Sequence, residues 1–97
     1  MTTRRKTARF IVAEDRTEEA LQAIRVFVAH AQSEPGTLVY QSWQSADRAT
    51  EFLHFMAFAD ERAEDAHRTS DELKHFTEVL YPLCTQRPVF EDWQEVR

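Results

Sequence analysis

Histidine is the side chain in this sequence best suited to move a proton near neutral pH, and its place in the chain limits what it can do. His67 follows Ala63 by four residues and precedes Ser70 by three, so a helix here would place all three on one side. We expect that side to face the interior. Three roles suit such a position: a core histidine bonded to the backbone or to Ser70, a proton-handling group in a pocket, or a ligand of a metal or haem.

A second set of side chains points to a pocket for an aromatic molecule. His54, Met56 and Phe58 are spaced two residues apart, which places them on the same side of an extended strand. Tyr40, on the preceding strand, is expected on that side too. A stripe of this kind is compatible with an ordinary core, and it also has the composition of a cavity between sheet and helices. Asp15 could lie at the edge of such a cavity or cap the helix that follows it.

The motifs that bind common cofactors are absent from the sequence. Gly36 is the only glycine, so a glycine-rich phosphate loop cannot be built. Cys84 is the only cysteine, which excludes an internal disulfide and a thiolate metal cage. There is no His-Glu-x-x-His helix. We therefore predict no cofactor and no metal ion.

The elements that must position these residues alternate between strand and helix patterns. An Asp-x-x-Glu box at residues 15–18, with Thr17 as a competing cap, predicts the start of the first helix. Asp60 is expected to cap a second helix, and a Thr-x-x-Glu box at residues 69–72 predicts that this helix breaks and restarts. The expected strands are residues 6–14, 37–44, 51–59 and 89–96, and the helices lie between the first and second and between the third and fourth. The order predicts an α+β, ferredoxin-like βαββαβ sandwich.

The third strand carries large apolar side chains on both of its sides. Phe52 and Phe58 point one way, while Leu53 and Phe55 point the other. Two helices can cover only one face of the sheet, so the other face would expose an apolar patch. Such a patch is larger than those that monomers usually tolerate. We therefore predict that two copies pack face to face as a homodimer.

Length and charge narrow the class of protein. The chain has 97 residues and a net charge of −5, which predicts a single domain over 1–97 and argues against nucleic-acid binding. Arg4, Arg5 and Lys6 are expected in a flexible tail formed by residues 1–7. No apolar run is long enough for a signal peptide or a membrane span, so we predict a cytoplasmic protein without membrane contact.

Two stretches of sequence resemble a known family. Residues 34–40, Glu-Pro-Gly-Thr-Leu-Val-Tyr, are similar to the Glu-Pro-Gly-x-Leu-x-Tyr signature of antibiotic biosynthesis monooxygenase (ABM) domains. Residues 58–70, which run from Phe58 to Ser70 through His67, resemble the second signature, and residues 74–83 continue the likeness. The resemblance extends over about residues 9–96. It implies a dimeric α+β barrel, which agrees with the two-sided sheet predicted above.

The resemblance is less specific for activity, because the family includes cofactor-independent oxygenases, haem-degrading enzymes and members without a known reaction. The common pattern has a Glu and a Trp on the third strand, where this sequence has Met56 and Phe58. Haem-degrading members are expected to have Asn, Trp and His at the places held here by Asp15, Phe58 and Thr77. The sequence therefore argues against haem degradation.

Two hypotheses follow, and the sequence leaves open whether the chain is an enzyme. In the first, the chain is a cofactor-independent monooxygenase of a phenolic or quinol-type molecule, with His67 as the base. Tyr40 and His54 would orient the substrate, Phe58 would stack on it, and Met56 and Ser70 would complete the pocket. In the second, the chain is a non-catalytic dimeric protein of the same fold that binds a small ligand or serves as a scaffold.

Overall fold

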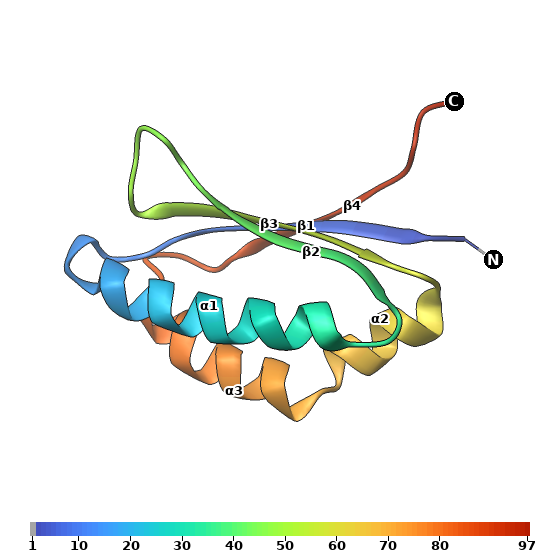
Figure 1. Ribbon diagram of the computed structural model, residues 1–97. Helices are drawn as coiled ribbons and strands as arrows, with labels where there is room; N and C mark the ends of the chain where they lie inside the picture. The colour runs from blue at the N-terminus through green and yellow to red at the C-terminus, as the bar shows by residue number, and fades with distance from the viewer. Residues whose placement is uncertain (1) are drawn as a thin grey trace.

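The computed structural model describes residues 2–97 as one antiparallel sheet with its helices on a single face (Figure 1). The strands lie in the order β2-β3-β1-β4, and every neighbouring pair is antiparallel. In chain order the elements are β1 (Arg4–Ile11), η1 (Glu14–Arg16), α1 (Thr17–Ser33), β2 (Thr37–Gln44), β3 (Glu51–Phe58), α2 (Glu61–Arg68), α3 (Asp71–Leu80), η2 (Tyr81–Leu83) and β4 (Val89–Trp93). This confirms the predicted α+β, ferredoxin-like βαββαβ arrangement.

The first strand begins earlier than predicted. Arg4 already belongs to β1, which lies between β3 and β4, so the expectation of a flexible tail is wrong for residues 4–7. Carboxylates from neighbouring elements hold this basic segment, which is why it is ordered. Lys6 Nζ lies 3.0 Å from a Glu64 oxygen and 3.2 Å from an Asp92 oxygen. Met1, the other end of the expected tail, lies outside the described residues.

The helix starts differ from the predicted capping boxes in two places. The first turn at Asp15 is the 3₁₀ helix η1, and α1 begins at Thr17 without a side-chain cap, so the Asp15 box is wrong. Asp60 caps α2 as predicted, because its Oδ1 accepts a hydrogen bond from the Ala63 N–H at 2.9 Å. At the restart the cap is Ser70 rather than Thr69, with the Leu73 N–H donating to the Ser70 hydroxyl. The break between α2 and α3 is confirmed.

The fourth strand is shorter than predicted and ends at Trp93, since residues 94–97 pair with no neighbouring strand. Its partner is β1 alone, as expected for an edge strand. No helix within residues 2–97 combines the length and the apolarity needed to cross a bilayer.

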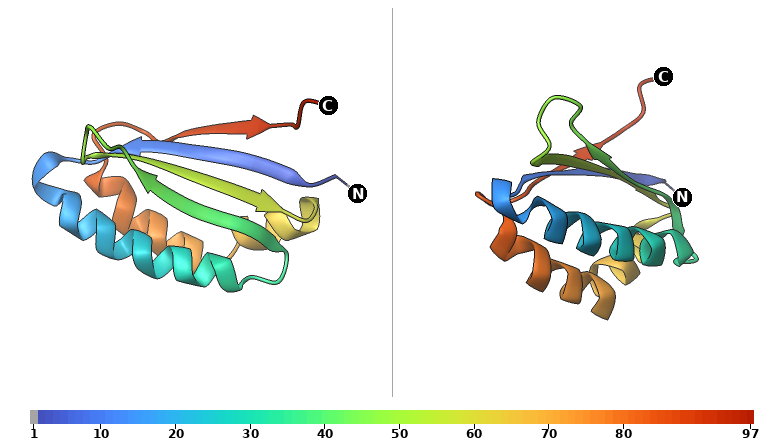
Figure 2. Two further views of the ribbon diagram at one scale, coloured as in Figure 1. Left: turned by 45° about the horizontal axis from the view of Figure 1, so that its top comes forward. Right: turned by 60° about the vertical axis from the view of Figure 1, so that its left-hand side comes forward.

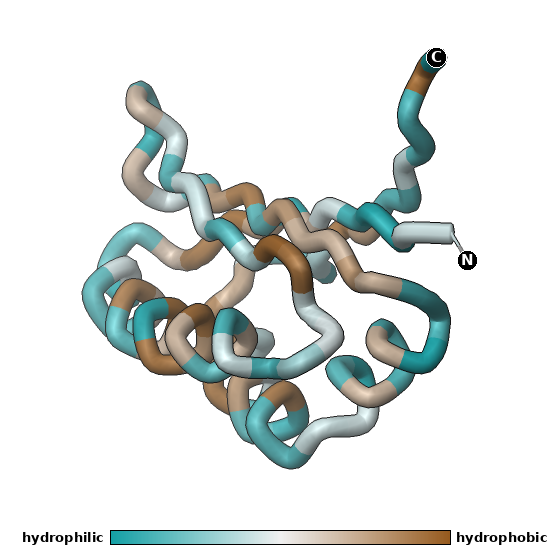
Figure 3. The backbone as a smooth tube through the Cα atoms, turned by 45° about the vertical axis from the view of Figure 1, so that its right-hand side comes forward, coloured by the Kyte–Doolittle hydropathy of each residue, from teal (hydrophilic) through white to brown (hydrophobic). Residues whose placement is uncertain are grey.

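The core lies between the sheet and the helices, and the opposite face of the sheet is left uncovered (Figure 2). Strand register explains the sorting: Phe10 pairs with Phe52, Ala8 with His54, and Tyr40 with Met56, and all of these face the helices. Figure 3 shows apolar residues running along the central strands and hydrophilic residues over the outer turns of the helices.

Gly36 allows the start of β2 to pack closely against α2. A Cβ atom at this position would lie 2.3 Å from the Ala63 Cβ, which is closer than two carbon atoms can approach. The Gly36 carbonyl also accepts a hydrogen bond from the Ala59 N–H at 2.9 Å. The only glycine therefore brings the chain just after α1 into contact with the helix that carries His67.

Candidate active site

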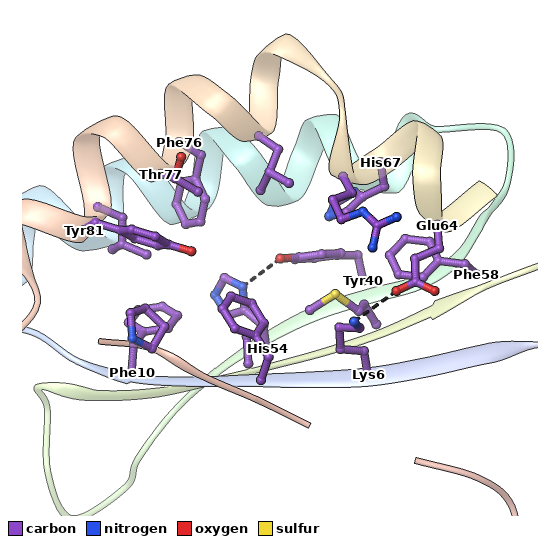
Figure 4. Close-up of a pocket in the computed structure, with 17 residues that line it drawn as sticks. Lys6, Phe10, Tyr40, His54, Phe58, Glu64, His67, Phe76, Thr77 and Tyr81 are labelled. Carbon is purple, nitrogen blue, oxygen red and sulfur yellow. Dashed lines mark hydrogen bonds and ion pairs between the residues drawn. The ribbon is translucent and has the colours of Figure 1, made fainter. Parts of the chain in front are cut away.

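A cavity of about 280 Å³ lies between the helix-facing side of the sheet and the pair α2 and α3 (Figure 4). Five of the predicted pocket residues line it: Tyr40, His54, Met56, Phe58 and His67. Ser70 does not line it. Its hydroxyl accepts from Leu73 and donates to the His67 carbonyl, so Ser70 orders the helix break instead of contacting a ligand. Asp15 is also outside the cavity wall, in an exposed turn.

The cavity wall is mostly apolar and large enough for an aromatic molecule. An apolar cavity of about 150 Å³ can hold benzene, so this one has room for more than a single ring. Its volume is near the lower end of the range of about 300–1,000 Å³ found for small-molecule sites. The other lining residues are Lys6, Ala8, Phe10, Glu64, Arg68, Leu73, Phe76, Thr77, Leu80, Tyr81, Pro88 and Phe90.

His67 is held by a carboxylate that comes from the end of α1. Its Nδ1 lies 2.8 Å from Oε1 of Glu34, and both side chains are largely buried. The Thr37 hydroxyl donates to the same oxygen at 3.0 Å, and His30 Nε2 lies 3.6 Å from the other Glu34 oxygen. A carboxylate acceptor selects the tautomer with a proton on Nδ1, which leaves the Nε2 lone pair of His67 available.

His54 is held by a phenol in place of a carboxylate. The Tyr40 hydroxyl lies 2.9 Å from His54 Nδ1, and both residues are buried. Burial lowers the pKa of His54 to about 4, so its imidazole is neutral at pH 7. Burial, with the nearby Glu34 charge, raises the pKa of Tyr40 well above its usual range, so the phenol keeps its proton.

Aromatic rings fix the orientation of both imidazoles. The ring centroid of Phe58 lies 5.0 Å from that of His67, and the Phe10 ring meets His54 edge-on at 5.0 Å. Phe27 and Phe76 stack at 4.4 Å between α1 and α3. Packing of this kind locks side-chain rotamers, so the polar atoms of the cavity are set before a ligand arrives.

Charged side chains lie at one part of the cavity wall. Burial opposes the charge of Lys6, but its hydrogen bonds to Glu64 and Asp92 outweigh this effect and raise its pKa. Lys6 is therefore a cation with two carboxylate partners. Arg68 pairs with Asp65 on the same helix. Each of these two cations in the cavity wall therefore lies beside a carboxylate.

Sequence reasoning missed Glu34, Lys6 and Glu64 as residues of this site. For Glu34 a signal was present, because it opens the Glu-Pro-Gly motif, but the motif was used to recognise the family and no role was assigned to the Glu34 carboxylate. The contact from Glu34 to His67 joins residues far apart in sequence, so no local pattern could show it. Within residues 2–97 no group of three potential metal ligands is close enough to hold an ion.

The comparisons with known proteins agree with this architecture. The family model of antibiotic biosynthesis monooxygenases (ABM) matches residues 4–79. A crystal structure of an antibiotic biosynthesis monooxygenase aligns with a TM-score of 0.93 at 16% identity, over 99% of this chain and 100% of that chain. Rv0793 from Mycobacterium tuberculosis aligns with a TM-score of 0.91 at 20% identity, over 99% and 97%. A conserved protein from Methanosarcina mazei gives 0.91 at 18%, over 99% and 95%.

At these identities the structural likeness concerns the fold alone. No curated protein matches the sequence. The family model, in contrast, covers most of the sequence, including both motifs noted above and the segments that carry Tyr40, His54 and His67. The chain belongs to the antibiotic biosynthesis monooxygenase (ABM) family.

Proposed function

We propose that the chain is a cofactor-independent monooxygenase that acts on a phenolic or quinol-type small aromatic molecule. The observation that carries this proposal is the apolar cavity in which two buried imidazoles, those of His54 and His67, face one space. An apolar wall desolvates an aromatic substrate, and an imidazole can take the proton of its hydroxyl.

Of the two imidazoles, His67 is the better candidate for the base. His54 is a weak base, because burial lowers its pKa to about 4 and its Nδ1 already bonds to Tyr40. His67 has its Nδ1 occupied by Glu34, which leaves Nε2 to accept a proton from the substrate. The imidazolium that forms then lies next to the Glu34 carboxylate, as in other acid–histidine pairs.

The proposed reaction uses O2 as the oxidant and needs no other electron source. His67 takes the phenolic proton, the electron-rich phenolate transfers one electron to O2, and the two radicals combine to form a C–O bond at an unsubstituted ring carbon ortho to the hydroxyl. The O–O bond then breaks as that carbon loses its proton. One oxygen remains as a quinone carbonyl, and the other leaves as water with the ring proton and the proton held by His67.

Oxygen uptake tests the proposal. We expect the purified protein to consume O2 with members of a panel of naphthols and quinols, and His67→Ala to slow this by about 10²–10⁴-fold. The matched control is His75→Ala, since His75 is exposed on α3 and does not line the cavity. If His67→Ala consumed oxygen as fast as the wild type, His67 would not be the base. If no member of the panel supported uptake, the oxygenase proposal would fail.

A second candidate is a non-catalytic protein that binds a small ligand in the same cavity. It is favoured by Met56 and Phe58, which stand where the common family pattern has Glu and Trp. Both side chains are buried in the cavity wall and supply no polar atom for chemistry. Binding of a naphthol, measured by calorimetry, without oxygen uptake would favour this candidate over the enzyme.

We further propose that two copies pair through the uncovered face of the sheet. Trp43, Val89 and Trp93 are exposed there, and Leu53 and Phe55 of β3 are only partly covered. Pairing would bury this apolar surface at about 25 cal/mol per Å². Sedimentation should show a dimer at micromolar concentration, and Phe55→Asp should shift it toward the monomer. A folded monomer of the wild-type chain at that concentration would contradict the proposal.

A further inference from the structure

His54 has an unusual hydrogen-bonding position within the described residues. Among the buried side-chain nitrogen and oxygen atoms of residues 2–97, the Nε2 atom of His54 is the one without a hydrogen-bond partner. The residue is 1% exposed. Leaving a buried polar atom without a partner is unfavourable, because the atom loses its hydrogen bonds to water and gains none in the protein. Such an atom in the wall of a cavity indicates that something which enters the cavity satisfies it.

The partner of the other ring nitrogen defines what Nε2 can offer. The Tyr40 phenol keeps its proton, and His54 Nδ1 is the acceptor within reach at 2.9 Å. When Tyr40 donates to Nδ1, the proton of the neutral imidazole is on Nε2. Nε2 is then a hydrogen-bond donor, directed away from Tyr40 because the two ring nitrogens point to different sides of the imidazole (Figure 4).

The two imidazoles therefore present opposite hydrogen-bonding groups at Nε2, an acceptor on His67 and a donor on His54. His67 donates through Nδ1 to Glu34 and keeps a lone pair on Nε2, whereas His54 accepts at Nδ1 and keeps a proton on Nε2. Tyr40 lies between them, with ring centroids 5.4 Å from His54 and 5.6 Å from His67. A ligand that bonds to both imidazoles needs a hydroxyl proton for one and an acceptor oxygen for the other.

We propose that Nε2 of His54 forms a second polar subsite, which selects aromatic ligands with an acceptor oxygen opposite the hydroxyl that lies against His67. This inference rests on the proposed use of the cavity for a phenolic molecule and narrows its class to aromatics with two oxygens. A hydroxyaryl ketone or a para-quinol fits this description. A phenol whose far end is apolar does not.

The test compares two probes of matched shape, 4-hydroxyacetophenone and 4-isopropylphenol, whose affinities are measured by calorimetry. The first has an acceptor oxygen para to its hydroxyl, and the second has a methyl group in its place. We expect the ratio of their affinities to fall about tenfold from the wild type to His54→Phe, because a lost hydrogen bond to a buried donor costs about 1.4 kcal/mol. Thr77→Val is the matched control, since Thr77 lines the cavity but its hydroxyl donates to the Lys74 carbonyl.

Nitrogen NMR of the unmodified protein gives a second readout that does not depend on a variant folding. We expect His54 to be the neutral tautomer with its proton on Nε2, and this signal to shift when 4-hydroxyacetophenone binds. A proton on Nδ1 of His54, or an affinity ratio unchanged in His54→Phe, would overturn the subsite. Failure of both probes to bind would overturn it as well.

These results separate the subsite from the oxygenase proposal. Selective ketone binding through His54 without oxygen uptake from any quinol would support the subsite and reject the enzyme. The opposite result is oxygen uptake that depends on His67, with the same ratio of probe affinities in the wild type and in His54→Phe. That result would support the enzyme and reject the subsite.

Discussion

The two faces of the sheet are built from the same four strands but bury very different amounts of surface. On the helix-facing side, Phe52 is 1% exposed, and its neighbours there are also buried. On the uncovered side, Trp43 is 58% exposed, and β1 presents Arg5, Thr7 and Arg9. The cavity and its two imidazoles all belong to the first side. The comparison teaches that the site lies on the face that the helices cover, while β1 keeps Arg5 and Arg9 on the other face.

The largest expected effect comes from removing one large side chain on each face. Phe52→Ala should lower the free energy of unfolding by about 3–5 kcal/mol, because it leaves a cavity in a packed core. Trp43→Ala should cost less than about 1 kcal/mol in the monomer, since its ring is mostly in water already. Urea unfolding measures both losses, in the Phe55→Asp background so that the monomer is compared. Equal losses of unfolding free energy in the two variants would show that the two faces contribute equally to stability.

Acid should destabilise the helix-facing side through His54. Because burial lowers its folded pKa to about 4, below the unfolded value of about 6.5, the unfolded chain binds the proton more readily. The stability from the neutral imidazole is complete above pH 6.5 and is lost as pH falls toward 4, by an amount on the order of 3 kcal/mol. His54→Phe should flatten this part of the curve of unfolding free energy against pH. A curve as steep as that of the wild type would contradict the shift.

The close approach of β2 to α2 is the next feature to test. Gly36→Ala should cost about 1–3 kcal/mol, because the new Cβ would overlap the Ala63 Cβ. Combining it with Ala63→Gly removes that overlap. Relative to Ala63→Gly alone, Gly36→Ala should then cost less than about 1 kcal/mol in a double-mutant cycle. If the losses of unfolding free energy in the two single variants simply add in the double variant, the overlap with the Ala63 Cβ is not the cause of the loss in Gly36→Ala.

The smallest expected effect is on the uncovered face. The Trp93 indole N–H donates to the Thr7 hydroxyl at 2.8 Å, in a position open to solvent. In the Phe55→Asp background, which favours the monomer, Trp93→Phe should lower the free energy of unfolding by at most about 1 kcal/mol, because water can replace the lost partner. Trp43→Phe is the control, as its indole makes no hydrogen bond within residues 2–97. A loss as large as that of Phe52→Ala would mean that this face is structurally essential.

Sequence reasoning recovered the βαββαβ order of the elements, and five of the residues it predicted for a pocket line one cavity. Its errors have identifiable causes. His54, Met56 and Phe58 could be assigned to one side because strand alternation is a local rule. The extra residue at Leu38, where the register between β2 and β3 shifts, did not disturb the placement of Tyr40. The basic start of β1 was misread, because a run of charged residues looks solvated until its partners are known. Ser70 was misassigned because a hydroxyl near a pocket residue serves equally well as a cap.

The sequence by itself determined which segments form helices and strands, which side chains they bury and the family to which the chain belongs. The helices, strands and buried side chains follow from spacing, caps and turn residues within a few positions of one another, and the family follows from the two sequence motifs and the family model. Only the tertiary structure decided that Glu34 holds His67, 33 residues away, and that Tyr40 holds His54, 14 residues away. The physical reason is that an imidazole acts as donor or acceptor according to the partner on its other nitrogen, and here that partner comes from a different element.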